Sequence, residues 1–252
     1  MQFFIIRSSP IVAAFAFLVA AHLLRYAYQQ WIVIFAGIGA LIVAYFLWLA
    51  WRLERFHFWP LMLYTLALFG VGMGSIIFLS NQLLVQAILV MWAFFALILF
   101  EAIFHYIYQT DKRRFVDLTQ VINYYNGIIF FTFVIIVFNA AIFLRLNWWL
   151  SWLSIGMMAG LLIFTQLHLK KVPRTWSLAL LVGLVCTQFV FSLHFLPVGV
   201  HVAAAVATLG FYWATSLILA NFEHILTRRR LITYSVVTLS LIGAVLLSAQ
   251  WL

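Results

Sequence analysis

Long apolar runs separated by short polar connections are the feature that most limits how this chain of 252 residues can fold. A helix that crosses the hydrocarbon core of a membrane needs roughly 20 apolar residues. Runs of about this length occur at 9–29, 31–51, 59–80, 83–108, 119–144, 148–168, 176–196, 199–222 and 231–251. Only 8% of the residues are charged, against about 25% in an average soluble domain. We therefore predict an all-α polytopic membrane protein with about nine transmembrane helices, forming a single membrane domain over residues 1–252.

The ends of these runs carry further signals. The first run is too long for the apolar part of a typical signal peptide, and no clear cleavage site follows it, so we expect it to be a span. A proline is tolerated in the first turn of a helix, where its missing N–H would be unpaired anyway. We accordingly expect the four prolines at the ends of spans, namely Pro10, Pro60, Pro173 and Pro197.

Basic residues occur in every second connection. The basic stretches are 52–56, 111–114, 170–174 and 228–230, and with Arg7 they place twelve of the fourteen Lys and Arg residues on one side. Positively charged connections stay in the cytoplasm. This pattern predicts a protein of the cytoplasmic (inner) membrane, with its N-terminus inside and its C-terminus outside.

The net charge of +9 is therefore interpreted as a topology signal rather than as a nucleic-acid surface. The partners expected are membrane lipids, since a basic face can attract anionic headgroups. A protein partner at this cytoplasmic face, or a second copy of the chain, is also possible. The connections are too short to hold a soluble domain, and no phosphate-binding glycine loop is found.

Two stretches of the chain resemble each other, "WAFFALILFEAI" at 92–103 and "WATSLILANFEHI" at 213–225. Both contain Trp-Ala, Leu-Ile-Leu and Phe-Glu in the same order, and both lead into a basic stretch. Other landmarks, among them Arg25 and Arg145, keep a similar offset. We predict two four-helix repeats, residues 1–118 and 119–230, followed by an extra helix at 231–252. Because four spans is an even number, the repeats would be parallel, and a ligand could bind at their interface.

Ionisable and amide side chains within or near the spans are the candidate site residues. Glu101 and His105, one helical turn apart, could form a proton or cation site; equally, Glu101 could be an ordinary charge at the membrane edge. Glu223 is the counterpart of Glu101 in the second repeat. Gln166 and Gln188 lie inside spans and need hydrogen-bonding partners there, so they are candidates for a polar lining or for simple interhelical hydrogen bonds.

Two further groups of side chains could bind a ligand. Asn123, Tyr124 and Asn126 lie at the start of one span and could line a polar vestibule, or could anchor the helix at the headgroups. His22, His194 and His201 fall toward the predicted outer side and could bind haem or a metal ion if their helices meet. No two of these three histidines share a helix at ligand spacing, and no cofactor is predicted. The single cysteine, Cys186, excludes an internal disulfide.

Glycines spaced by four residues predict close helix packing. Gly70 and Gly74 form one such pair, and Gly156 and Gly160 form another.

Three classes of function remain compatible with the sequence. The first is a membrane protein that transports or binds a small apolar or lipid-like solute, since the predicted interior is poor in charge. The second is a non-catalytic subunit or scaffold of a membrane complex, and the third is a redox protein that binds haem or a metal. An enzyme is not favoured, because no nucleophile–base pair or intramembrane aspartate pair is present.

Overall fold

The computed structural model describes residues 2–26, 30–53, 58–79, 81–108 and 118–249, and this part of the chain is helical apart from its short connections. The helices are α1 (Gln2–Tyr26), α2 (Trp31–Leu53), α3 (Trp59–Ile77), α4 (Gln82–Tyr108), α5 (Leu118–Phe143), α6 (Trp148–Leu169), α7 (Thr175–Leu193), α8 (Val200–Phe222) and α9 (Arg228–Ser248). Eight of them, α2–α9, are long and apolar enough to cross a membrane, and α1 adds a shorter apolar stretch, Arg7–Ala20. The prediction of an all-α polytopic membrane protein is confirmed.

The prolines follow the predicted pattern with one exception. Pro60 lies in the first turn of α3, as expected. Pro173 and Pro197 lie in the connections before α7 and before α8. Pro10, in contrast, lies inside α1, because this helix begins at Gln2 rather than near residue 9. The apolar run alone misplaced this helix start, since residues 2–8 mix apolar and polar side chains yet continue the helix.

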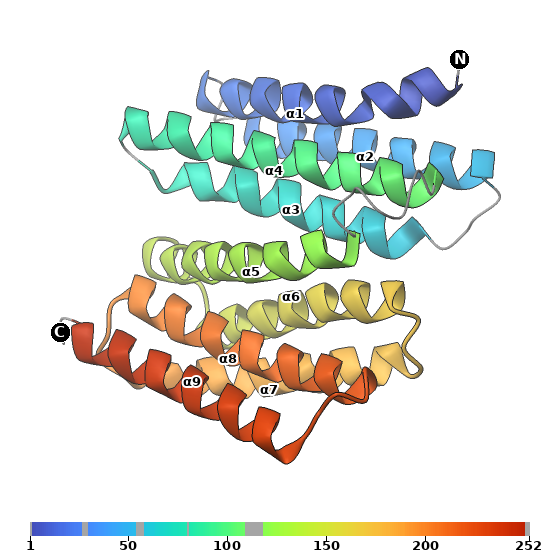
Figure 1. Ribbon diagram of the computed structural model, residues 1–252. Coiled ribbons are helices and arrows are strands. Elements are labelled where there is room, and N and C mark those ends of the chain that lie inside the picture. The colour runs from blue at the N-terminus through green and yellow to red at the C-terminus, as the bar shows by residue number, and fades with distance from the viewer. Residues whose placement is uncertain (1, 27–29, 54–57, 80, 109–117, 250–252) are drawn as a thin grey trace. The chain divides into compact units, whose positions relative to one another are not determined.

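The chain forms two compact units, Met1–Tyr125 and Asn126–Leu252, and α5 contributes to both. In the first unit α1 packs against α2, α3 and α4 (Figure 1). Phe17 of α1 is fully buried, and its ring meets that of Phe69 at 5.3 Å in an edge-to-face arrangement. The contact depends on Gly72 of α3, because a Cβ at that position would lie 2.9 Å from the Phe17 ring.

This contact corrects one of the glycine predictions. Gly70, which the four-residue spacing singled out, has open space where a Cβ would lie. The close approach in α3 occurs at Gly72 instead, two residues along and therefore on another face of the helix.

In the second unit α7 packs against α6 and α8, and α9 packs on α8. Here the glycine prediction is confirmed. A Cβ on Gly156 of α6 would lie 2.7 Å from the carbonyl oxygen of Gly183 in α7, and one on Gly160 would lie 3.1 Å from that of Ala179. Small residues four apart on both helices thus let the two backbones meet directly.

The basic stretch 111–114 and most of the stretch 52–56 lie outside the described residues. The orientation in the membrane and the internal duplication remain predictions.

Candidate functional site

Glu101 joins two helices of the first unit. Its Oε1 accepts a hydrogen bond of 2.7 Å from Nη1 of Arg7 in α1, and Nε2 of His105 lies 3.1 Å from the same oxygen. The Arg7 guanidinium also lies over the ring of Phe104, 5.1 Å from its centre. About a third of the Glu101 side chain and half of the Arg7 side chain are exposed. A partly exposed carboxylate that is already paired favours the interpretation of Glu101 as an edge charge over a buried proton site.

Glu223 forms the corresponding ion pair of the second unit. Its carboxylate accepts a hydrogen bond from Nζ of Lys170, which caps the end of α6. The pair ties the end of α8 to the end of α6, and both side chains are partly exposed. The two glutamates of the similar sequence stretches therefore each link two helices. Their basic partners lie on different helices of the two units, Arg7 on α1 and Lys170 at the end of α6.

The amide side chains divide between core and surface. Nδ2 of Asn126 donates a hydrogen bond of 3.0 Å to Oε1 of Gln166, and both residues are buried. Among the described residues, Oδ1 of Asn126 has no hydrogen-bond partner. Gln188 is exposed on α7, so it does not share a lining with Gln166.

The predicted vestibule does not form one surface. Tyr124 is 71% exposed, Asn126 is buried and Asn123 is intermediate between them. The three side chains follow one another around α5, as the helical period of 3.6 residues requires.

The candidate haem or metal ligands are spread over both units. His22 is exposed on α1 of the first unit, while His194 and His201 are exposed in the second. The His194 ring packs against Trp148 with centres 4.2 Å apart, beside a cavity of about 200 Å³. Within the described ranges, no three His, Cys, Asp or Glu side chains come together as metal ligands would.

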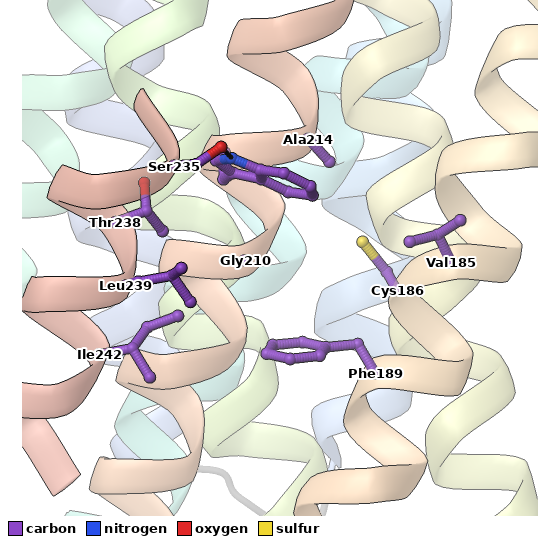
Figure 2. Close-up of a pocket in the computed structure, with 10 residues that line it drawn as sticks. Val185, Cys186, Phe189, Gly210, Ala214, Ser235, Thr238, Leu239 and Ile242 are labelled. Atoms are coloured by element: carbon purple, nitrogen blue, oxygen red, sulfur yellow. Dashed lines mark hydrogen bonds between the residues drawn. The ribbon is translucent and has the colours of Figure 1, made fainter. Parts of the chain in front are cut away.

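A larger cavity of about 370 Å³ lies between three helices of the second unit (Figure 2). It is lined by Val185, Cys186 and Phe189 of α7, Gly210, Trp213 and Ala214 of α8, and Ser235, Thr238, Leu239 and Ile242 of α9. Three of these residues were noted in the sequence, Cys186 as the single cysteine and Trp213 and Ala214 as part of the repeated stretch 213–225, but none was predicted to line a site. A signal that could have pointed to this place was the pair of small residues in α8, Gly210 and Ala214, which leave room beside that helix.

Two contacts shape this cavity. The Phe189 ring lies against the backbone of Gly210, where a Cβ would come within 2.6 Å of the ring. Nε1 of Trp213 donates a hydrogen bond of 3.1 Å to Oγ of Ser235, linking α8 to α9 (Figure 2). The cavity therefore has an aromatic wall on α7 and a polar link between α8 and α9.

The helix α9 closes one side of the cavity only loosely. None of its residues, Arg228–Ser248, is buried. Among the described residues α9 packs on α8 and has no helix contact with α7, so the cavity separates these two helices. The α9 side of the cavity is therefore the side with the least cover from the rest of the second unit.

A family designated DUF5656, described as a protein of unknown function, matches residues 62–248. The chain belongs to this family. The DUF5656 match extends from α3 to the end of α9 and includes every residue that lines the larger cavity. No curated protein and no solved structure matches the chain.

Proposed function

We propose that this membrane protein binds a small apolar or lipid-like molecule taken from the bilayer, in the cavity between α7, α8 and α9. The observation that carries the proposal is the cavity itself, at about 370 Å³. Ligand sites in proteins commonly measure about 300–1,000 Å³ and are mostly apolar with a few polar groups. Here the polar groups are Trp213, Ser235 and Thr238.

The side chains that line the cavity favour a ligand whose portion inside the cavity is uncharged or only weakly polar. No charged side chain is among the residues that line the cavity. An apolar cavity does not hold water stably, whereas an acyl chain or a similar apolar group would fill it at little desolvation cost. Binding is the step shared by a transporter and by a protein that only stores or senses such a molecule.

Filling the cavity tests this proposal. Ala214→Phe adds a ring inside it, and Ala244→Phe adds the same ring at an exposed position of α9 outside it. Each protein would be purified from native membranes in mild detergent, and the retained small molecules would be identified by mass spectrometry. We expect a molecule retained by the wild type and by Ala244→Phe to be reduced roughly tenfold or more in Ala214→Phe, a change of about 1.4 kcal/mol in binding free energy.

Equal retention by Ala214→Phe and Ala244→Phe would contradict the proposal. A protein that co-purifies in fixed ratio with all three forms, with no small molecule retained, would instead support the role of a subunit in a membrane complex.

We further place the protein in the cytoplasmic membrane with its N-terminus inside. The pairing of Lys170 with Glu223 supports this orientation, because it brings the basic connection before α7 and the basic start of α9 to the same end of the second unit. The test is labelling of single cysteines introduced at Lys171 and at Leu146, in a Cys186→Ser background. We expect impermeant reagents to reach position 146 from outside and position 171 only from inside; labelling of both from one side would refute the orientation.

A further inference from the structure

The basic end of the second unit contains an unbalanced group of cationic side chains. At the end of α6, in the connection before α7 and in the first turn of α9, these are Lys170, Lys171, Arg174, Arg228, Arg229 and Arg230. Glu223 is the acidic residue among them, and it is paired with Lys170. The pair holds these two basic stretches at the same end of the second unit, and most of their positive charge is uncompensated by carboxylates of that unit. This end of the second unit therefore attracts anions that the second unit does not itself provide.

The start of α9 relates this charge to the cavity. Positions 7, 11 and 14 residues apart fall on nearly the same face of an α-helix, since each residue turns by about 100°. Counted from Arg228, these positions are Ser235, Leu239 and Ile242, all of which line the cavity. Arg228 is therefore the first residue on the face of α9 that lines the cavity, whereas Arg229 is turned about 100° away from that face.

Distances along α9 match the dimensions of one lipid leaflet. At 1.5 Å per residue, Ser235 lies about 10 Å and Ile242 about 21 Å from Arg228 along the helix axis. With its headgroup regions a bilayer is about 40–45 Å thick, so one leaflet, headgroup included, measures about 20–22 Å. An amphiphile of one leaflet's length, with its headgroup at Arg228, would therefore reach as far as Ile242 at the far end of the cavity.

The polarity of the cavity changes in the same direction. Ser235 and Thr238 lie toward the end nearer the start of α9, and Ile242 and Phe189 lie toward the opposite end (Figure 2). The hydrogen bond from Trp213 to Ser235 belongs to the polar end. Charge, hydroxyl groups and apolar side chains thus follow one another along a single path, as the headgroup, linkage and chain of an amphiphile do.

We infer that the ligand is an anionic amphiphile, with a phosphate or carboxylate headgroup bound at Arg228 and an apolar chain in the cavity between α7, α8 and α9. This inference rests on the proposed function, whose apolar ligand it specifies. The Arg guanidinium binds carboxylate and phosphate through two parallel hydrogen bonds. The N-terminus of α9 adds a partial positive charge at the same place.

The test compares two phospholipids with identical chains, phosphatidylglycerol and phosphatidylcholine, titrated into the delipidated full-length protein in neutral detergent and followed by native mass spectrometry. The variants are Arg228→Gln, the matched charge loss Arg229→Gln, and Ala214→Phe, with Ile242→Trp as a second cavity-filling variant. Circular dichroism checks that each variant is folded. A further titration adds inorganic phosphate alone.

We expect the wild type to bind phosphatidylglycerol at least about tenfold more tightly than phosphatidylcholine. Arg228→Gln should remove most of this preference and Arg229→Gln should keep it. The cavity-filling variants should weaken both lipids, and inorganic phosphate should compete poorly, because it lacks the chain.

Each opposite result is informative in a different way. Equal affinity for the two lipids, with both lost in the cavity-filling variants, would overturn the anionic headgroup and leave the proposed function standing. Equal effects of Arg228→Gln and Arg229→Gln would overturn the headgroup site at Arg228 and favour general attraction by the surface charge.

Strong binding of inorganic phosphate at Arg228, unaffected by cavity filling, would overturn the inference that the ligand is an amphiphile. Lipid binding that no cavity-filling variant changes would contradict the proposed function itself.

Discussion

Gly156 of α6 and Gly183 of α7 meet backbone to backbone. A Cβ on Gly156 would lie 2.7 Å from the carbonyl oxygen of Gly183, and a Cβ on Gly183 would lie 2.8 Å from that of Gly156. Backbone atoms cannot rotate away as a side chain can, so neither position has room for a larger residue. The packing of α7, one wall of the cavity, depends on this contact.

Gly156→Ala should therefore destabilise the second unit. Forcing a methyl group into a well-packed contact typically costs about 1–3 kcal/mol, and we expect a lower midpoint of thermal unfolding in detergent. Gly243→Ala is the matched control, because a Cβ at Gly243 of α9 meets open space. If both variants unfold at the temperature of the wild type, the close α6–α7 contact is incorrect.

Gly210→Ala should alter binding more than stability. The added methyl group would meet the ring of Phe189, which is a flexible side chain and can move, but its movement changes the wall of the cavity. We expect binding of the retained lipid-like molecule to weaken roughly three- to tenfold, or about 1 kcal/mol. Adding Phe189→Leu, which shortens the side chain, should recover part of the loss. Unchanged binding in Gly210→Ala would show that the Phe189 wall does not contact the ligand.

Asn126 and Gln166 should show energetic coupling. Asn126→Leu alone leaves the Gln166 amide without this buried partner, and Gln166→Leu does the same to Asn126. Interhelical hydrogen bonds in membranes contribute about 0.6–2 kcal/mol. The double variant should be less destabilised than the sum of the single variants by about that amount, measured as free energies of unfolding. Strict additivity would mean that the hydrogen bond between the two amides contributes nothing.

Glu101→Gln should be tolerated. The pair with Arg7 is partly exposed, and exposed ion pairs contribute about 0–1 kcal/mol. We expect normal membrane insertion and a change in unfolding free energy below about 1 kcal/mol, with Glu223→Gln behaving alike. Loss of ligand binding in Glu101→Gln at unchanged stability would point back to a functional site at Glu101 and His105.

The positions of the helices could be predicted because the signal is local. A span needs a minimum length of apolar residues, and the run 83–108 differs from α4 (Gln82–Tyr108) by a single residue. The start of α1 was missed for the same reason, since Arg7, Ser8 and Ser9 interrupt the apolar run although the helix continues through them. Local length rules identify spans, but they do not report where a helix continues beyond the apolar run.

The site was harder to predict because it depends on which face of each helix meets a neighbour. Gln166 and Gln188 look alike in sequence, yet one is buried and the other exposed. Gly70 and Gly72 are two residues apart, yet only Gly72 lies at a close contact. The larger cavity combines ordinary apolar side chains from three helices, so no motif marks it. Tertiary packing alone brings Phe189, Trp213 and Ser235 around one space.

Photocrosslinking is the most direct test of ligand binding in this cavity. A fatty acid with a diazirine at the end of its chain would be added to membranes containing the full-length protein, and labelled residues would be identified by mass spectrometry after irradiation. We predict that labels concentrate on the lining residues of α7, α8 and α9, such as Phe189 and Ile242, and decrease when Ala214→Phe fills the space. Labels spread evenly over the exposed faces of the helices, and unchanged in Ala214→Phe, would contradict the account.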